Sequence, residues 1–159
     1  MNQRLSSPPP GLASQFLPAG VLLVEDNLAD VRLTVELLRE AKLANRLKVI
    51  GDGSEALEHL AAAGRTPDAE PLPDLILLDL DLPGTDGRTM LARMRADPLL
   101  AHILVFLLTA SATHREMVQE EGLEADGYLE KPIDLAAFVH LVTHQERFWL
   151  ELVCAPRGL

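Results

Sequence analysis

Short apolar runs with no polar interruption recur along this chain, and they constrain its fold more than any other feature. Two of the clearest are LILL, which leads into Asp79, and ILVFLL, which leads into Thr109. Strands that are apolar at every position are buried on both faces, as in parallel sheets that helices cover on either side. Hydrophobic residues make up 48% of the chain but aromatic residues only 4%, so we expect a core of aliphatic side chains.

Stretches with helical spacing separate the apolar runs. We predict strands at residues 21–26, 47–50, 75–79, 103–109 and 127–131. We predict helices after a cap at Asp30, after a cap at Ser54, and from Arg88, Thr113 and Asp134. This alternation, with right-handed crossovers, predicts an α/β fold with a doubly wound parallel sheet and helices on both faces. For five strands, the flavodoxin-like order 2-1-3-4-5 is the natural candidate.

Composition divides the chain into three segments. Residues 1–20 contain a proline triplet and no continuous apolar region, so we interpret them as a flexible leader and not as a secretory signal. Residues 21–145 are predicted to form one domain. The last helix is predicted to extend to Leu152, so that residues 146–159 form an arm beyond the domain. Its apolar stripe is too wide to pack on one sheet face alone.

Charge and cysteine content exclude several classes of function. The formal net charge is -10, which argues against nucleic acid as a partner, since a polyanion requires a basic surface. No apolar run approaches the roughly 18 residues that cross a membrane. Cys154 is the single cysteine, which excludes an internal disulfide bond and fits a cytoplasmic protein.

Polar residues follow the predicted strands at the ends where ligands bind in folds of this kind. Glu25 and Asp26 end the first strand, Asp79 the third, Thr109 the fourth and Lys131 the fifth. The carboxyl ends of parallel strands meet at one edge of the sheet. In the order 2-1-3-4-5, the binding crevice lies between the first and third strands. We therefore expect these side chains to lie close together.

Each of these residue types suits phosphoryl transfer. The carboxylates of Asp26 and Asp79, with Glu25 beside them, repel one another unless a cation is present. Mg²⁺ is the hard divalent ion most often found where a phosphate also binds, with Mn²⁺ as an alternative. An Asp79 oxygen is then placed to attack phosphorus, while Lys131 and Thr109 contact phosphoryl oxygens.

Four segments carry a resemblance to a known family. VLLVEDN, LILLDLDLPGTDG, LLTAS and GYLEKP resemble, in order and spacing, the signature segments of the CheY-like receiver domain of two-component response regulators. The resemblance spans Val21 to about Thr143. It implies that Asp79 is the phosphoacceptor, that Thr109 is the switch hydroxyl and that Lys131 senses the phosphoryl group. It also implies that Glu25 and Asp26 are the acidic pair, with Glu25 acting on the metal through water.

The resemblance implies further roles around this set. The backbone carbonyl of Asp81 would be a metal ligand, Tyr128 the switch aromatic, and the Lys131–Pro132 bond cis. Asp81 and Ser111 would tune the lifetime of the phosphate. Simpler interpretations stay open, because Tyr128 also suits ordinary core packing and Ser111 also suits a helix cap.

The resemblance also indicates partners. No effector domain follows the receiver, so we expect a single-domain regulator that takes phosphate from a sensor histidine kinase, catalyses only its own phosphorylation and dephosphorylation, and signals through protein contacts. VEDNLADVRLTVELL and the FW-containing tail look most like regulators of phytochrome-type kinases, which makes a bacteriophytochrome the narrower expectation. We also expect a homodimer formed by the last two helices and the arm, with Phe148, Trp149 and Leu152 at the interface. A tail folded back on its own domain is the alternative.

Other interpretations of single motifs fit the sequence less well. GDGSEA at residues 51–56 matches a dinucleotide-binding fingerprint, but it follows the second strand and suits a turn better. Asp79 and Asp81 after an apolar strand resemble the nucleophile motif of haloacid-dehalogenase-type phosphatases, which would leave Glu25 and Asp26 unexplained. A pseudo-receiver that takes no phosphate conflicts with the intact site. The i, i+4 pair His140 and His144 is interpreted as surface.

Overall fold

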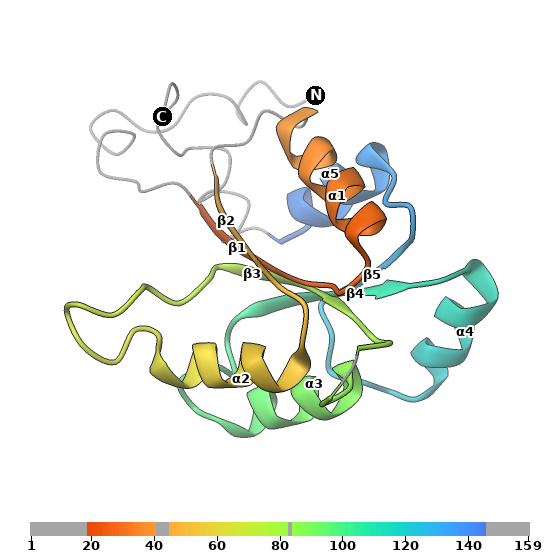
Figure 1. Cartoon of the computed structure of the whole chain (residues 1–159). Helices are drawn as coiled ribbons and strands as arrows, with labels where there is room; N and C mark the ends of the chain where they lie inside the picture. The colour runs from red at the N-terminus through yellow and green to blue at the C-terminus, as the bar shows by residue number, and fades with distance from the viewer. Residues whose placement is uncertain (1–18, 41–44, 83, 146–159) are drawn as a thin grey trace.

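The computed structural model describes residues 19–40, 45–82 and 84–145, and within them strands and helices alternate as predicted (Figure 1). The strands are β1 (Ala19–Val24), β2 (Asn45–Ile50), β3 (Leu75–Asp79), β4 (Leu104–Thr109) and β5 (Gly127–Glu130). The helices are α1 (Leu28–Glu40), α2 (Gly53–Ala62), α3 (Gly87–Ala96), α4 (Ala112–Glu120) and α5 (Leu135–Thr143). None of the described helices is long and apolar enough to cross a membrane.

The five strands form one parallel sheet in the order β2-β1-β3-β4-β5, which confirms the predicted strand order. Val21 of β1 lies opposite Leu47 on one side and Leu75 on the other. The central strands β1, β3 and β4 are therefore the apolar ones, because both of their faces are covered.

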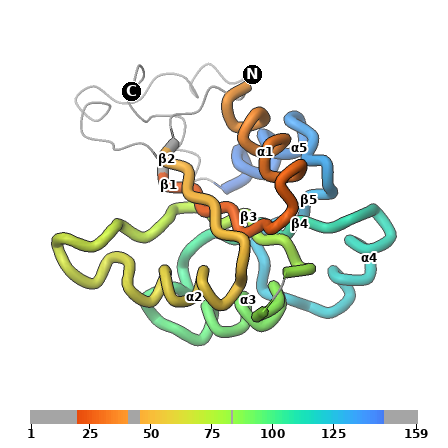
Figure 2. The backbone as a smooth tube through the Cα atoms, viewed as in Figure 1, coloured from red at the N-terminus to blue at the C-terminus, as the bar shows by residue number. Residues whose placement is uncertain are grey.

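Helices cover the sheet on two sides, α1 and α5 on one and α2 and α3 on the other (Figure 2). Strand β3 contributes to both core layers, and all five of its side chains are buried. Leu75 and Leu77 pack in the layer under α1 and α5, whereas Ile76 and Leu78 pack in the layer with α2, α3 and Val118 of α4. Burial on alternate faces explains why the strand tolerates no polar residue before Asp79.

Two predicted helix caps are wrong by a few residues. Helix α1 begins before Asp30, and the side chain of Asn27 accepts the Asp30 N–H at 3.0 Å. Helix α2 is capped by Asp52 and not by Ser54, since the Asp52 carboxylate accepts the Ser54 N–H at 2.7 Å and that of Glu55 at 3.1 Å. Both caps lie just before the first helical residue, from where a short side chain reaches the first helical amides; at Asp52 the backbone is extended.

The predicted continuous helix from Asp134 to Leu152 is also wrong. Helix α5 ends at Thr143, with His144 as its cap and its ring nitrogen Nδ1 2.7 Å from the His140 carbonyl oxygen. Residues 146–159, and with them Phe148, Trp149 and Leu152, lie outside the described part of the chain. His140 and His144 are exposed, which confirms that this pair lies on the surface.

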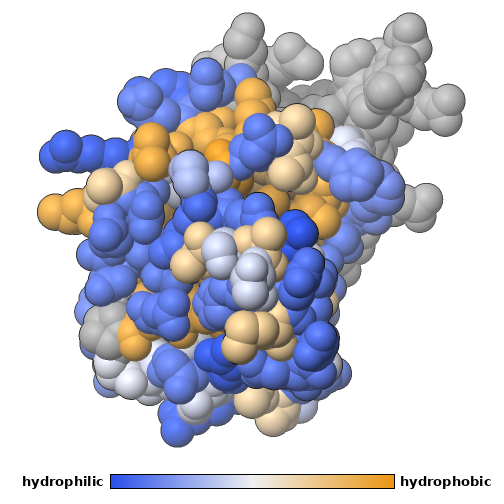
Figure 3. All heavy atoms as spheres, turned by 90° about the vertical axis from the view of Figure 1, so that its right-hand side faces the viewer, coloured by the Kyte–Doolittle hydropathy of each residue, from blue (hydrophilic) through white to orange (hydrophobic). Residues whose placement is uncertain are grey.

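The face that carries α4 and β5 is largely hydrophilic (Figure 3). Hydrophobic side chains gather in its upper part, where α1 and α5 lie. Among the described residues on these two helices, Leu28 is 74% exposed, Leu33 52% and Val139 42%. Leu28 stands out because it opens α1 beside the edge of the sheet where the predicted acids lie.

Candidate functional site

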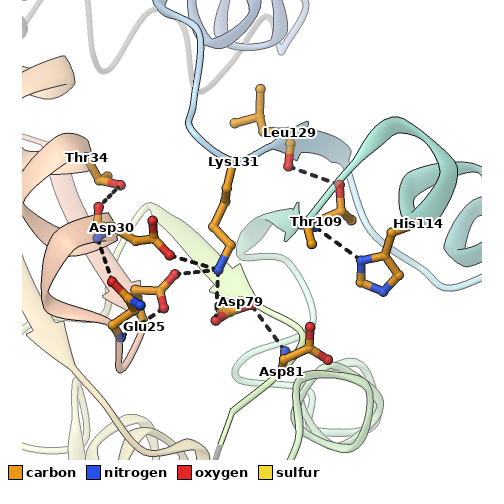
Figure 4. A network of polar contacts seen from close by, with 11 residues as sticks. Glu25, Asp30, Thr34, Asp79, Asp81, Thr109, His114, Leu129 and Lys131 are labelled. Carbon is orange, nitrogen blue, oxygen red and sulfur yellow. Dashed lines mark hydrogen bonds and ion pairs between the residues drawn. The ribbon is translucent and has the colours of Figure 1, made fainter.

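The fold brings most of the predicted site residues to one edge of the sheet (Figure 4). Asp79 and Thr109 end β3 and β4, as predicted. Glu25 and Asp26 follow β1, and Lys131 follows β5, each just beyond the last strand residue. The Glu25 N–H still donates to the Ile50 carbonyl at 3.1 Å, so the chain leaves the sheet only after placing the Glu25 side chain at its edge.

Lys131 lies at the centre of this edge. Its Nζ is 3.1 Å from Glu25 Oε1, 3.2 Å from Asp79 Oδ2 and 3.2 Å from Asp30 Oδ2. All four side chains are at least partly buried, and those of Glu25 and Asp79 are almost completely so. Lys131 therefore acts as the shared counter-ion of three carboxylates.

Asp30 is a member of this group that the sequence predicts only as a helix cap. It lies in the first turn of α1, and a second acid four residues after Asp26 was the available signal. Its contact with Lys131, 101 positions away along the chain, depends on the tertiary fold and has no local signature.

The electrostatics of the site favour a bound cation. Burial is the main reason why the pKa of Glu25 rises to about 7; the Asn27 N–H opposes this rise and the Asp79 carboxylate adds to it. Burial also disfavours the charged form of Lys131, but the carboxylates of Asp79, Glu25 and Asp30 outweigh it and raise the pKa of Lys131 above its ordinary value. The lysine is thus charged at neutral pH, while Glu25 carries a carboxylate that its surroundings stabilise poorly.

Glu25, Asp26 and Asp79 could hold a metal ion. One carboxylate oxygen of each lies within 4.8 Å of those of the other two. Glu25 and Asp79 are buried, whereas Asp26 is exposed, so the set is open to solvent on one side. All three offer oxygen ligands, which suits a hard divalent cation.

The backbone after β3 orients the Asp79 carboxylate. The N–H of Asp81 donates to Asp79 Oδ1 at 3.1 Å, and Lys131 contacts the other oxygen, Oδ2. From the described residues each carboxylate oxygen therefore has one donor, while the Asp81 side chain itself is exposed.

The β4–α4 turn places Thr109 and Ser111 beside this group. Thr109 is completely buried, and its hydroxyl donates to the Leu129 carbonyl of β5 at 3.4 Å. Ser111 is exposed and caps α4 by accepting the His114 N–H at 3.1 Å, as its simpler interpretation predicts. His114 Nδ1 in turn accepts the N–H of Ala110 at 3.2 Å, which fixes the turn directly after Thr109.

Tyr128 and Pro132 lie on either side of Lys131 in sequence. Tyr128 is half-buried against the core layer of α2, α3 and α4. Burial, with the charge of Glu121, raises the pKa of its hydroxyl. The Lys131–Pro132 peptide bond is cis, the isomer that the family resemblance implies.

Comparison with known proteins agrees with this arrangement. Residues 21–143 match the family model described as response regulator receiver domain. Response regulator Rcp1 of Synechocystis sp. is 38% identical over 139 residues, which are 87% of this chain and 94% of Rcp1.

Solved structures resemble the chain over most of its length. The bacteriophytochrome response regulator RtBRR is 34% identical, with a TM-score of 0.73 over 82% of this chain and 78% of that one. The Mn²⁺-bound form of Rcp1 gives a TM-score of 0.64 at 38% identity, over 87% and 99% of the two chains. The phosphorylated cyanobacterial phytochrome response regulator RcpA gives 0.64 at 37% identity, over 84% and 94%.

Proposed function

Because the chain belongs to the response regulator receiver domain family, we propose that it accepts a phosphoryl group on Asp79 from a sensor histidine kinase. The observation that carries this proposal is the setting of Asp79. Its carboxylate is buried at the carboxyl edge of the sheet and oriented by the Asp81 N–H and the Lys131 ammonium, and two further acids lie within reach of a shared cation.

Mg²⁺ is the cation that we assign to this site. Asp26, Asp79 and the backbone carbonyl of Asp81 would hold it, with Glu25 acting through water. The donor set fits, since it consists of oxygen atoms and brings together more carboxylates than Lys131 alone neutralises. Bound Mg²⁺ would supply positive charge to the acids and to the phosphoryl oxygens. The Mn²⁺-bound form of the similar Rcp1 supports a divalent ion.

The reaction follows from the residues present. An Asp79 carboxylate oxygen forms a bond to phosphorus while the bond between phosphorus and the donor's histidine nitrogen breaks, and the imidazole keeps the electron pair. Lys131, held 3.2 Å from Asp79 Oδ2, is placed to compensate the charge of the incoming phosphoryl oxygens. Phosphoryl transfer of this kind depends mainly on positioning and electrostatics, so no general base is required.

The response would begin at Thr109. Among the described residues its hydroxyl has one long hydrogen bond, to the Leu129 carbonyl at 3.4 Å, and it would exchange this partner for a phosphoryl oxygen. Tyr128, next to Leu129 on β5 and half-buried, would adjust to the movement. We propose that the change reaches partners through the face made by α4, β5 and α5.

A kinase of the phytochrome type is the partner that we favour. RtBRR and RcpA, both similar to this chain, are described as bacteriophytochrome and phytochrome response regulators. Leu28 supports a protein partner at the acidic edge, since it is 74% exposed two residues after Asp26.

We also propose a homodimer in which α4, α5 and the C-terminal arm contact a second copy. We do not propose nucleic acid as a partner, because a chain with a formal net charge of -10 repels a polyanion.

Intact mass spectrometry tests the proposal directly. The wild-type protein is incubated with acetyl phosphate and Mg²⁺ beside Asp79→Ala and the neighbouring control Asp81→Asn. We expect one added phosphate on the wild type and on Asp81→Asn, and none on Asp79→Ala. A wild-type protein that stays unmodified, or an Asp79→Ala variant that still gains phosphate, would overturn the assignment.

A further inference from the structure

The turn at residues 51–54, whose last two residues open α2, lies between the two segments that carry the acids of the site. On one side it adjoins the end of β1, where a Cβ atom on Gly51 would lie 3.5 Å from Asp26 Cα. That distance is an ordinary van der Waals contact. The turn therefore lies directly beside the backbone that carries Asp26.

On its other side the turn is pressed against the loop between β3 and α3. A Cβ atom on Gly53 would overlap the carbonyl oxygen of Thr85 and lie 2.9 Å from the Thr85 carbonyl carbon. The hydroxyls of Ser54 and Thr85 are 2.8 Å apart and share a hydrogen bond. Only glycine at position 53 permits this approach, because the atoms that it meets belong to the backbone of the loop.

A second glycine completes the contact from the loop side. Gly84 has φ +74, and a Cβ atom there would lie 3.0 Å from Asp52 Oδ2. Asp52 is the cap of α2, so the loop rests directly on the capped end of the helix. The same loop carries Asp81 near its start, and the Asp81 N–H orients Asp79.

We propose that this turn, with Gly53 as its key residue, sets the separation between Asp26 and the loop that carries Asp81, and thereby selects a small cation. The inference rests on the proposed function, because it concerns the metal site assigned to these residues. Gly53 is a positioning residue, since it contacts neither the acids nor a ligand.

The separation that the turn sets matters because Mg²⁺ and Ca²⁺ differ in size. Mg²⁺ requires near-ideal octahedral geometry at about 2.0–2.1 Å, whereas Ca²⁺ accepts oxygen ligands at about 2.3–2.6 Å in flexible arrangements. A site whose two halves are held together therefore favours Mg²⁺. If a side chain at position 53 pushes the loop outward, the affinity of the site for Mg²⁺ falls more than its affinity for Ca²⁺.

This role also accounts for the motif GDGSEA. Its second glycine is required, but by the backbone of Thr85 and not by a dinucleotide phosphate. Its aspartate caps α2, and its serine pairs with Thr85.

Isothermal titration of the full chain with MgCl₂ and with CaCl₂ tests the proposal. For Gly53→Ala we expect the Mg²⁺ dissociation constant to rise at least about tenfold and that of Ca²⁺ to change less than about threefold. Gly51→Ala is the matched control in the same turn. Its added methyl meets only ordinary contacts, so both affinities should stay near those of the wild type.

The outcomes are distinguishable. If Gly53→Ala binds both ions as the wild type does, or loses affinity for both equally, the turn does not select cation size and the inference is wrong. If the wild type binds neither ion, the proposed metal site itself is wrong. Should Gly53→Ala fail to fold by circular dichroism, Thr85→Val takes its place, because it removes the hydroxyl pair that joins the loop to Ser54. It must weaken Mg²⁺ binding more than Ca²⁺ binding, whereas Thr85→Ser, which keeps a hydroxyl, must leave both affinities near those of the wild type.

Discussion

The carboxyl group of Glu25 occupies a place that suits its protonated form. It is 2% exposed and shares the edge of the sheet with Asp79. Its pKa of about 7 lies well above the ordinary value of 4.5, chiefly because of burial. At neutral pH without a cation, ionised Glu25 therefore reduces the stability of the fold, and a bound cation removes this effect.

Glu25 therefore makes the stability of the fold depend on pH. The unfolded state ionises Glu25 near pH 4.5 and the folded state near pH 7, so its contribution to stability falls as pH rises through that window. Glu25→Gln imitates the protonated form. In cation-free buffer, the unfolding free energy of the variant minus that of the wild type should rise by on the order of 2 kcal/mol between pH 4.5 and pH 8.

Urea denaturation at both pH values measures this difference. Glu36→Gln, on the exposed surface of α1, is the control and should show the same difference at both pH values. A difference for Glu25→Gln that does not change with pH would contradict the prediction.

At the scale of elements, Arg95 joins α3 to the opposite, amino-terminal edge of the sheet. Its guanidinium donates to the carbonyl oxygens of Ala101 and Ile103 around the start of β4 and, at 2.8 Å, to that of Glu124 before β5. It also pairs with the Asp126 carboxylate at 2.9 Å. The Asp126 carboxylate in turn accepts the Val105 N–H at 2.9 Å, so one side chain ties a helix to two strands.

Removal of Arg95 should therefore destabilise the fold. Arg95→Met leaves the part-buried Asp126 carboxylate without its charged partner and three carbonyl groups without their donor. We expect the unfolding free energy to fall by about 2–4 kcal/mol. Arg93→Met on the same helix, where the side chain is exposed, should change it by less than about 0.5 kcal/mol. Equal losses in the two variants would show that the Arg95 contacts do not carry the stability.

The elements that the sequence predicts best are those whose pattern is set by burial alone. β3 and β4 are apolar because both faces are covered, so their ends, and with them Asp79 and Thr109, can be read from the chain. The caps at Asn27 and Asp52 were missed because a cap depends on backbone angles that several neighbouring polar residues could satisfy. The contact of Asp30 with Lys131 and the end of α5 at Thr143 depend on tertiary packing, which leaves no periodic signal.

At the scale of the whole molecule, the proposed homodimer depends on residues beyond α5. Helix α5 ends at Thr143 with His144 as its cap, and the family model matches residues 21–143, so we expect the receiver fold to form without residues 146–159. A chain that ends at Gln145 should therefore keep its fold and sediment as a monomer.

Analytical ultracentrifugation compares this shortened chain with the full one. A chain that begins at Ala19 and keeps the C-terminal arm is the control, and it should sediment as a dimer. If the chain ending at Gln145 remains a dimer, the arm is not the dimer contact.

Strand β3 has a consequence for the molecule as a whole, because its packing on both faces holds Asp79, the proposed phosphate acceptor, in place. Its side chains fill both core layers in turn, and a shift of the strand would open voids above and below the sheet at once. A phosphoryl group added to Asp79 must then be accommodated by its neighbours, among them the Thr109 hydroxyl with its long bond. If Asp79 accepts a phosphoryl group, we therefore expect the modified residue to keep its position and its neighbours to make the structural change.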